Sequence, residues 1–143
     1  MIRRDERGQA LAETALLSPI LALLLVGLID VGHLAQFSVR VHTAAHAGVE
    51  YGAQSLTTAP DSTGMQNAAS NDAAISGMTA TGSYSCTCAD GSNSTCQATD
   101  CSSSHRITYV TVTTSAPYST LIHWPGMTSS FTVTGSATMR VRQ

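Results

Sequence analysis

The sequence contains no lysine, and charged residues make up only 11% of it. The formal net charge is -2 at pH 7, and all seven basic residues are arginines. Proteins that bind nucleic acid neutralise phosphates with clustered basic side chains, so this chain lacks the electrostatic basis for such binding. A nucleic acid is therefore excluded as the expected partner.

Aromatic residues are also scarce, at 5% of the chain, with two Phe and one Trp. Such a chain cannot build a large aromatic core. Its apolar residues are mainly Ala, Val, Leu and Ile, and many of them lie in the N-terminal segment. The remainder is rich in Ser, Thr, Gly and Ala, which suits a secreted or surface-exposed domain. A length of 143 residues leaves room for one such domain and one membrane anchor.

Catalytic motifs are missing as well. The sequence has no G-x-S-x-G nucleophile elbow and no glycine-rich phosphate loop. His42, His46 and Glu50 are spaced four residues apart, so they share one helix face and could in principle hold a metal. A polar stripe on an exposed helix is the commoner meaning of this spacing. We therefore expect a protein that is not an enzyme, with no metal, no cofactor and no evident small-molecule substrate.

An almost purely apolar run occupies residues 15–29. Together with residues 10–14 it gives twenty residues, enough to cross roughly 30 Å of hydrocarbon at ~1.5 Å per residue. The sequence therefore predicts a transmembrane helix near the N-terminus.

The charges around this run predict its orientation. Arg3, Arg4 and Arg7 precede the run, and the nearest cation after it is Arg40. The positive-inside rule places the N-terminus in the cytoplasm and the C-terminal part outside. A conventional signal peptide is disfavoured, because the nearest downstream A-x-A motif, at residues 45–47, lies too far from the apolar run.

The helix is expected to continue well beyond the apolar run. Small and apolar residues recur at spacings of three, four or seven: Leu34, Phe37, Val41, Ala44, Ala45, Val49 and Leu56. Pro60 discourages further continuation. We predict one helix over residues 9–57 that is transmembrane in its first half. Pro19, inside it, should remove one backbone hydrogen bond and bend the helix.

The start of this helix carries a specific motif. Residues 7–19 read R-G-Q-x-x-x-E-x-A-L-x-x-P, with Gly8, Gln9 and Glu13 at its key positions. With arginines before Gly8, this is the layout of a prepilin-type leader, and it resembles the TadE-like proteins of the bacterial tight-adherence (Flp) pilus apparatus. Residues 44–52 also resemble a stretch of that family. They depart from it at His46, where Arg is usual, and at Val49-Glu50, which replace Ala-Arg.

The resemblance implies how the protein is processed and what it does. A prepilin peptidase would remove residues 1–8 by cutting between Gly8 and Gln9, and Glu13 would then pair with a freed amino terminus during assembly. The implied partners are other pilin-like subunits and the Tad membrane assembly platform, and the implied location is the bacterial inner membrane, followed by a cell-surface pilus. The chain is long for a major Flp pilin, which favours a minor pilin or an assembly component. The alternative is an uncleaved, membrane-tethered binding module, in which Glu13 reaches the headgroup region of an ordinary anchor.

Residues 58–143 are expected to form an extracytoplasmic β domain. A short helix is predicted around residues 65–73, and strands over 79–85 and 106–115, followed by a loop through 116–126. From Phe131 to Val141 apolar and polar residues alternate, as in a strand of a half-buried sheet. The fold class is therefore α+β: a long helix packed on a small antiparallel sheet, in the manner of pilins.

Four cysteines, Cys86, Cys88, Cys96 and Cys101, should form disulfides outside the cytoplasm. A bond between Cys86 and Cys88 would close a strained ring, which leaves two of the three connectivities. The nested one, Cys88–Cys96 inside Cys86–Cys101, is favoured because it fits a hairpin turning near residues 90–91. A zinc site that includes His105 is disfavoured, because C-x-C is not the usual ligand spacing.

Overall fold

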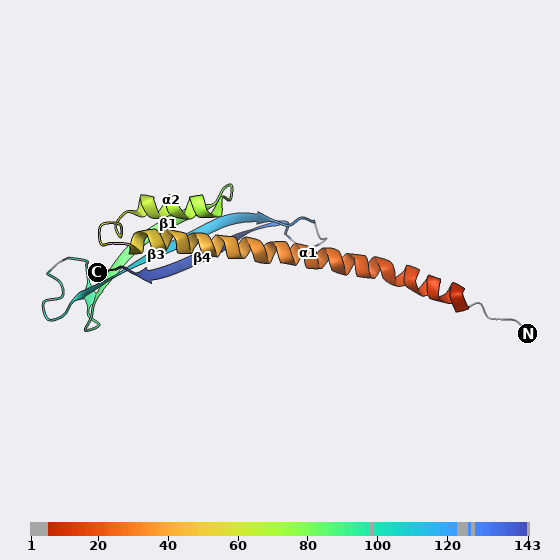
Figure 1. Cartoon of the computed structure of the whole chain (residues 1–143), viewed down its shortest axis with the longest axis horizontal. Helices are drawn as coiled ribbons and strands as arrows, with labels where there is room; N and C mark the ends of the chain where they lie inside the picture. Colours follow the sequence, from red (N-terminus) through yellow and green to blue (C-terminus); the bar gives the residue numbers. More distant parts are fainter. Residues whose placement is uncertain (1–5, 98, 123–125, 127, 143) are drawn as a thin grey trace, which may run out of the picture.

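The computed structural model describes residues 6–97, 99–122, 126 and 128–142, with side chains from residue 11 onward. Helix α1 (Glu6–Ala53) is 48 residues long, which corresponds to about 72 Å. Figure 1 shows it as a gently curved rod, whose N-terminal half projects away from the rest of the chain. The predicted long helix is confirmed, although it begins at Glu6 and ends at Ala53.

Helix α1 ends before Leu56 because other donors bind its last carbonyl groups. The Thr58 hydroxyl donates to the Gly52 oxygen at 3.1 Å, and the Arg142 amide donates to the Ala53 oxygen at 3.0 Å. These donors replace the amides that a further helical turn would supply. The C-terminal end of the chain is thereby tied to the end of α1.

Helix α2 (Ser62–Ala73) matches the predicted short helix and is capped at both ends. Asp61 is its N-cap and accepts the Gly64 amide at 2.9 Å and the Tyr51 hydroxyl at 2.8 Å. These hydrogen bonds favour the charged carboxylate and lower the pKa of Asp61. At the other end, Arg40 Nη2 donates to the Ala73 oxygen at 2.9 Å, which places a cation at the negative end of the helix dipole.

Four antiparallel strands form one sheet in the order β2-β1-β3-β4. Their bounds are β1 (Thr79–Cys88), β2 (Asn93–Ser94), β3 (Arg106–Ser119) and β4 (Ser130–Arg140). The predicted strands are all present. β3 is longer than expected because it continues through Pro117, beyond the last β1–β3 pair of Thr79 with Ser115. There β3 has a neighbouring strand on one side only, which is where strands tolerate proline.

The two helices cover one face of the sheet (Figure 1). Val110, Val112 and Ala137 are buried beneath them, and Val41 and Val49 are buried on the facing side of α1. The other face carries Ser and Thr side chains in register across three strands, such as Ser83, Thr111 and Thr138. The alternation predicted for the last strand is therefore confirmed, with its apolar side turned to α1.

Glycines allow α1 to lie very close to the sheet. A Cβ atom on Gly48 would lie 3.0 Å from the Met65 carbonyl oxygen and 3.0 Å from Val112 Cγ1. One on Gly135 of β4 would lie 2.9 Å from the Val41 carbonyl oxygen. The small and apolar residues that recur along the second half of the predicted helix, such as Ala45 and Val49, are thus the ones that contact the sheet.

Candidate functional site

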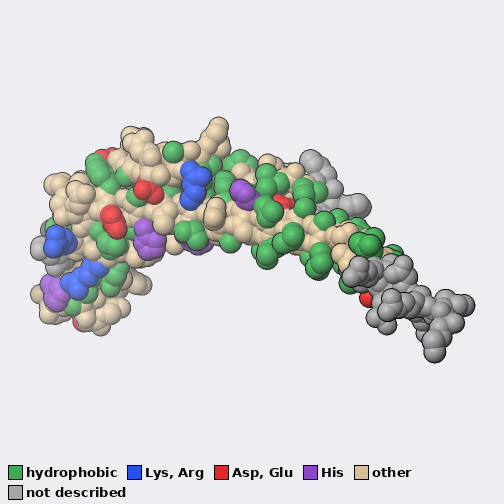
Figure 2. All heavy atoms as spheres, turned by 45° about the vertical axis from the view of Figure 1, so that its right-hand side comes forward, with side chains coloured by type: hydrophobic (Ala, Val, Ile, Leu, Met, Phe, Trp, Pro, Cys, Tyr) green, Lys and Arg blue, Asp and Glu red, His purple; other side chains and the backbone are tan. Residues whose placement is uncertain are grey.

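The N-terminal half of α1 exposes nearly all its apolar side chains. Ten of them have exposed fractions of 55–73%: Leu11, Leu16, Leu17, Ile20, Leu21, Leu23, Leu24, Leu25, Leu28 and Ile29. Figure 2 shows hydrophobic atoms gathered along the helix where it extends beyond the sheet. So large an apolar surface requires a lipid bilayer or other helices to cover it. Among the described residues, α1 is the one helix long and apolar enough to cross a membrane.

The residues of the predicted processing site lie at the start of this surface. The backbone of Gly8 and Gln9 belongs to the first turns of α1, whereas Arg3 and Arg4 lie outside the described residues. Glu13 follows one turn after Gln9 and is exposed. Four residues of helix correspond to about 6 Å along the axis, and side chains of an α-helix lean towards its N-terminus, so the Glu13 side chain is directed towards Gln9. A positive group at the level of Gln9 would offset the cost of placing a carboxylate in an apolar segment.

Pro19 does not interrupt α1. Proline has no N–H, so the Ala15 carbonyl four residues earlier loses its helical donor. The Ser18 hydroxyl donates to that same oxygen at 3.3 Å. A carbonyl group without a hydrogen-bond donor costs roughly several kcal/mol in hydrocarbon. The hydrogen bond from Ser18 therefore helps α1 to remain continuous within a membrane.

The four cysteines form two disulfides, but the favoured nested pairing is wrong. Cys86 is bonded to Cys96 and Cys88 to Cys101, with Cα–Cα distances of 5.1 and 5.5 Å. The reason is the register of the hairpin, in which Ser94 lies opposite Cys86. Cys96 is therefore close to Cys86, while Cys88 lies nearer the turn and meets Cys101 as the chain returns to begin β3.

Two aspartates organise the loop between the cysteines. The Asp100 carboxylate accepts hydrogen bonds from the Thr95 hydroxyl and amide at 2.8 and 2.6 Å, the Ser94 hydroxyl at 3.0 Å and the Gln97 amide at 3.1 Å. These donors lower the pKa of Asp100, the Thr95 hydroxyl most. The side chain and amide of Ser92 likewise lower the pKa of Asp90. Both carboxylates accept hydrogen bonds from neighbouring residues of the loop, so their role is structural.

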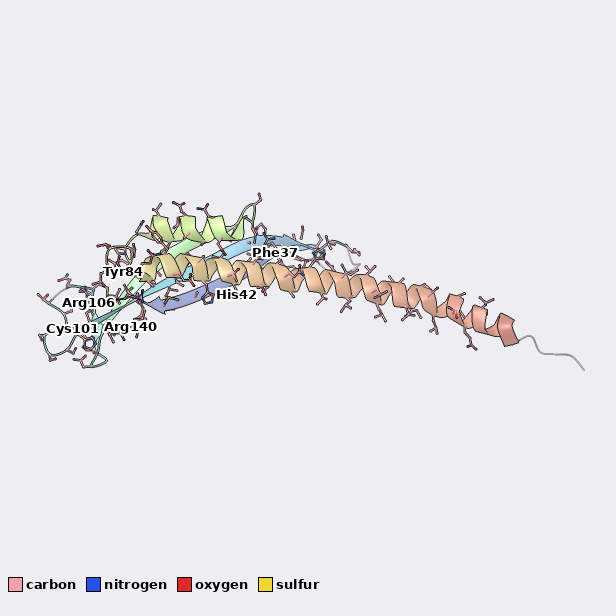
Figure 3. All side chains as sticks on the ribbon, viewed as in Figure 1. Phe37, His42, Tyr84, Cys101, Arg106 and Arg140 are labelled. Atoms are coloured by element: carbon pink, nitrogen blue, oxygen red, sulfur yellow. A yellow bond between two sulfur atoms is a disulfide. The ribbon has the colours of Figure 1, made fainter. Side chains whose placement is uncertain are left out.

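The structure also shows where the two candidate metal sites lie: the His42, His46 and Glu50 side chains, and the cysteines with His105. His42, His46 and Glu50 are exposed along α1, and Figure 3 shows His42 on its flank. Within residues 11–97, 99–122, 126 and 128–142, no group of three or more His, Cys, Asp or Glu side chains is placed to hold a metal ion. All four cysteine sulfurs are in disulfides, so a zinc site with His105 has no thiolate ligands.

Asp30 is the feature that sequence reasoning missed. It follows directly after the apolar run, at residue 30, yet only 8% of it is exposed. Its Oδ1 accepts the Leu121 amide at 3.2 Å, although 91 residues separate the two in the chain. The one signal in the sequence was a carboxylate at the end of an apolar run, and nothing there indicated a partner.

These features define a class of protein: a membrane-associated α+β protein whose helical stalk carries a small disulfide-bridged sheet. Residues 8–50 match the family described as TadE-like protein, which covers most of α1 and ends before the sheet. The resemblance predicted from the Gly8–Glu13 motif is thereby confirmed over these residues. No curated protein and no solved structure matches the chain.

Proposed function

We propose that this chain is a minor pilin or an assembly component of a Tad pilus or a related secretion system. The observation that carries the proposal is the division of α1. Its second half is buried against the sheet, with Val41, Ala45 and Val49 wholly inaccessible, while its first half exposes a continuous apolar surface. A stalk of this kind has to be covered by lipid before assembly and by neighbouring helices after it.

The proposed work of the protein is packing. Prepilin peptidase cuts between Gly8 and Gln9, and the Tad membrane platform then draws the subunit out of the inner membrane, with its N-terminus originally cytoplasmic. Glu13 pairs with the new amino group of a neighbouring subunit, which sets the register between adjacent stalks. The β domain, which lies beyond the family match, makes the contacts specific to this subunit.

Substitution of Glu13 tests the assembly role. Glu13→Gln keeps the shape of the side chain and removes its charge, so we expect membrane insertion to persist and incorporation into sheared filaments to be lost. Glu50→Gln is the matched control, because Glu50 is also an exposed carboxylate on α1 but lies outside the apolar half. A blot comparing filament and membrane fractions gives the result. Normal incorporation of the Glu13→Gln chain contradicts the proposed contact.

Identifying the N-terminal residue of the native protein distinguishes a processed pilin from a membrane-tethered binding module. A processed pilin begins at Gln9, and a Gly8→Val substitution should leave the chain uncut. A membrane-tethered binding module keeps its first eight residues and remains in the membrane fraction. Mass spectrometry of protein isolated from cells decides between them, and an N-terminus at Met1 alone rejects the processed pilin.

A further inference from the structure

A cavity of about 260 Å³ lies where α1 leaves the sheet. Its walls come from Asp30, Val31 and Leu34 of α1 and from Tyr118 and Phe131 at the ends of β3 and β4. Figure 3 places Phe37, which contacts Tyr118, at this end of the sheet and Cys101 at the opposite end. The cavity is thus located at the boundary between the apolar half of α1 and the folded domain.

The wall of this cavity contains one acidic side chain, Asp30, and none of the described residues that line the cavity is basic. Asp30 and Tyr118 are each only 8% exposed. Asp30 accepts the Leu121 amide, and the Tyr118 hydroxyl lies close enough to Asp30 for burial and the neighbouring carboxylate together to raise the Tyr118 pKa. A buried carboxylate is costly unless a positive group accompanies it. The polar part of the cavity wall therefore suits a cationic group.

The aromatic walls favour the same kind of group. The Tyr118 ring lies between Phe37 and Phe131, with ring centroids 5.1 and 5.3 Å away. Tyr118 and Phe131 both line the cavity, so two aromatic residues border the space beside Asp30. Aromatic faces attract ammonium groups, more strongly when water is excluded.

An apolar groove continues from the cavity along the membrane half of α1. Gly27 and Val31 line both the cavity and this groove, and Ile20, Leu24 and Leu28 line the groove further on. Gly27, which has no side chain, lies where the cavity and the groove adjoin. An occupant that fits both must join a cationic group to a long hydrocarbon chain.

We propose that this site binds a phospholipid with an ammonium headgroup of the phosphatidylethanolamine type. The ammonium lies beside Asp30 and Tyr118, one acyl chain follows the groove towards Ile20, and the Thr128 hydroxyl at the cavity wall is a donor for the phosphate. The inference rests on membrane insertion of α1 and is independent of whether subunits assemble through Glu13. The bound lipid would fix the depth at which the β domain sits above the bilayer.

Lipid retention by the full chain tests the proposal. The protein, solubilised in a mild detergent, is mixed with equal amounts of phosphatidylethanolamine, its N-acetylated form and phosphatidylglycerol, and bound lipid is measured by native mass spectrometry. N-acetylation removes the positive charge and keeps the acyl chains. We expect phosphatidylethanolamine to be retained about tenfold better than either of the other lipids, which corresponds to about 1.4 kcal/mol. Equal retention of the three lipids overturns the proposal.

Two variants locate the site. Asp30→Asn should abolish the preference for phosphatidylethanolamine, while Glu50→Gln should leave it unchanged. The lipid comparison on the unaltered chain decides the matter even where Asp30→Asn disturbs folding. Lipid-free dimers that disappear in Asp30→Asn would assign the cavity to a second copy of the chain and overturn the lipid proposal. Because Glu13→Gln tests assembly and leaves this site intact, loss of assembly with lipid retention preserved separates the two proposals.

Discussion

The hydroxyl of Thr114 donates a hydrogen bond of 2.8 Å to the main-chain carbonyl oxygen of Val41. Thr114 lies in the middle of β3 and is wholly buried, and Val41 is where α1 begins its buried half. The same hydroxyl lies 3.3 Å from the Gly135 oxygen of β4. One side chain thus connects the helix to two strands, at the level where the stalk meets the domain.

Replacing Thr114 tests the energetic value of this link. Thr114→Val keeps the shape of the side chain and removes the hydroxyl, so we expect the free energy of unfolding to fall by about 1 kcal/mol. Thr114→Ser keeps the hydroxyl and should recover the hydrogen-bonding part of that loss. Urea unfolding of the full chain in detergent measures both. A Thr114→Val chain as stable as the original would show that the hydrogen bond contributes nothing net.

Two glycines of α1 give a matched pair for the close approach of helix and sheet. Gly48→Ala would place a methyl group 3.0 Å from the Met65 carbonyl oxygen, which cannot move without shifting α2, so we expect a loss of about 1–3 kcal/mol. Gly32→Ala meets nothing within 4 Å and should raise helix stability by up to about 1 kcal/mol. Unfolding of the two variants in the same detergent should therefore move in opposite directions. A Gly48→Ala chain that gains stability would contradict the tight packing.

The sequence is most predictive where one local pattern determines the outcome. The period of apolar residues in α1 and the alternation from Phe131 to Val141 each follow from the geometry of a single element, and both are confirmed. The disulfide pairing depends instead on hairpin register, which places Ser94 opposite Cys86 and so brings Cys96 near Cys86 rather than near Cys88. The burial of Asp30 depends on a loop from the far end of the chain. Contacts of this kind have no local signature, which is why the cavity could not be foreseen.

The disulfide connectivity can be checked by counting thiols. In a Cys86→Ser/Cys96→Ser chain the Cys88–Cys101 bond should still form, so alkylation of the oxidised protein should find no free thiol. In a Cys88→Ser/Cys96→Ser chain, Cys86 and Cys101 each lose their partner, and two thiols should react. The nested pairing predicts the reverse in both variants. Loss of either bridge should also lower stability by roughly 2–4 kcal/mol, as is typical for loops of this kind.

Stability should depend on pH through the capping and loop aspartates. Hydrogen bonds lower the pKa of Asp61, Asp90 and Asp100 in the folded chain. A carboxyl group whose folded pKa lies below its unfolded value stabilises the fold fully above the unfolded pKa, near 3.9 for Asp. That stabilisation is lost as the pH falls through the folded pKa. These three groups should therefore change the melting temperature little between pH 7 and about pH 5. At pH values below about 4 the melting temperature should decrease.

Asp100→Asn makes this prediction specific to one group. It keeps the side-chain shape but removes the charge that accepts four hydrogen bonds, so the variant should melt at a lower temperature than the original at pH 7. Acidification protonates Asp100 in the original chain, so the difference between the two melting temperatures should shrink as the pH falls through the lowered pKa of Asp100. Asp72→Asn, at an exposed site on α2, is the control and should follow the original curve. Circular dichroism with the disulfides intact measures all three, and a difference that stays constant with pH would mean that the charge of Asp100 does not organise the loop.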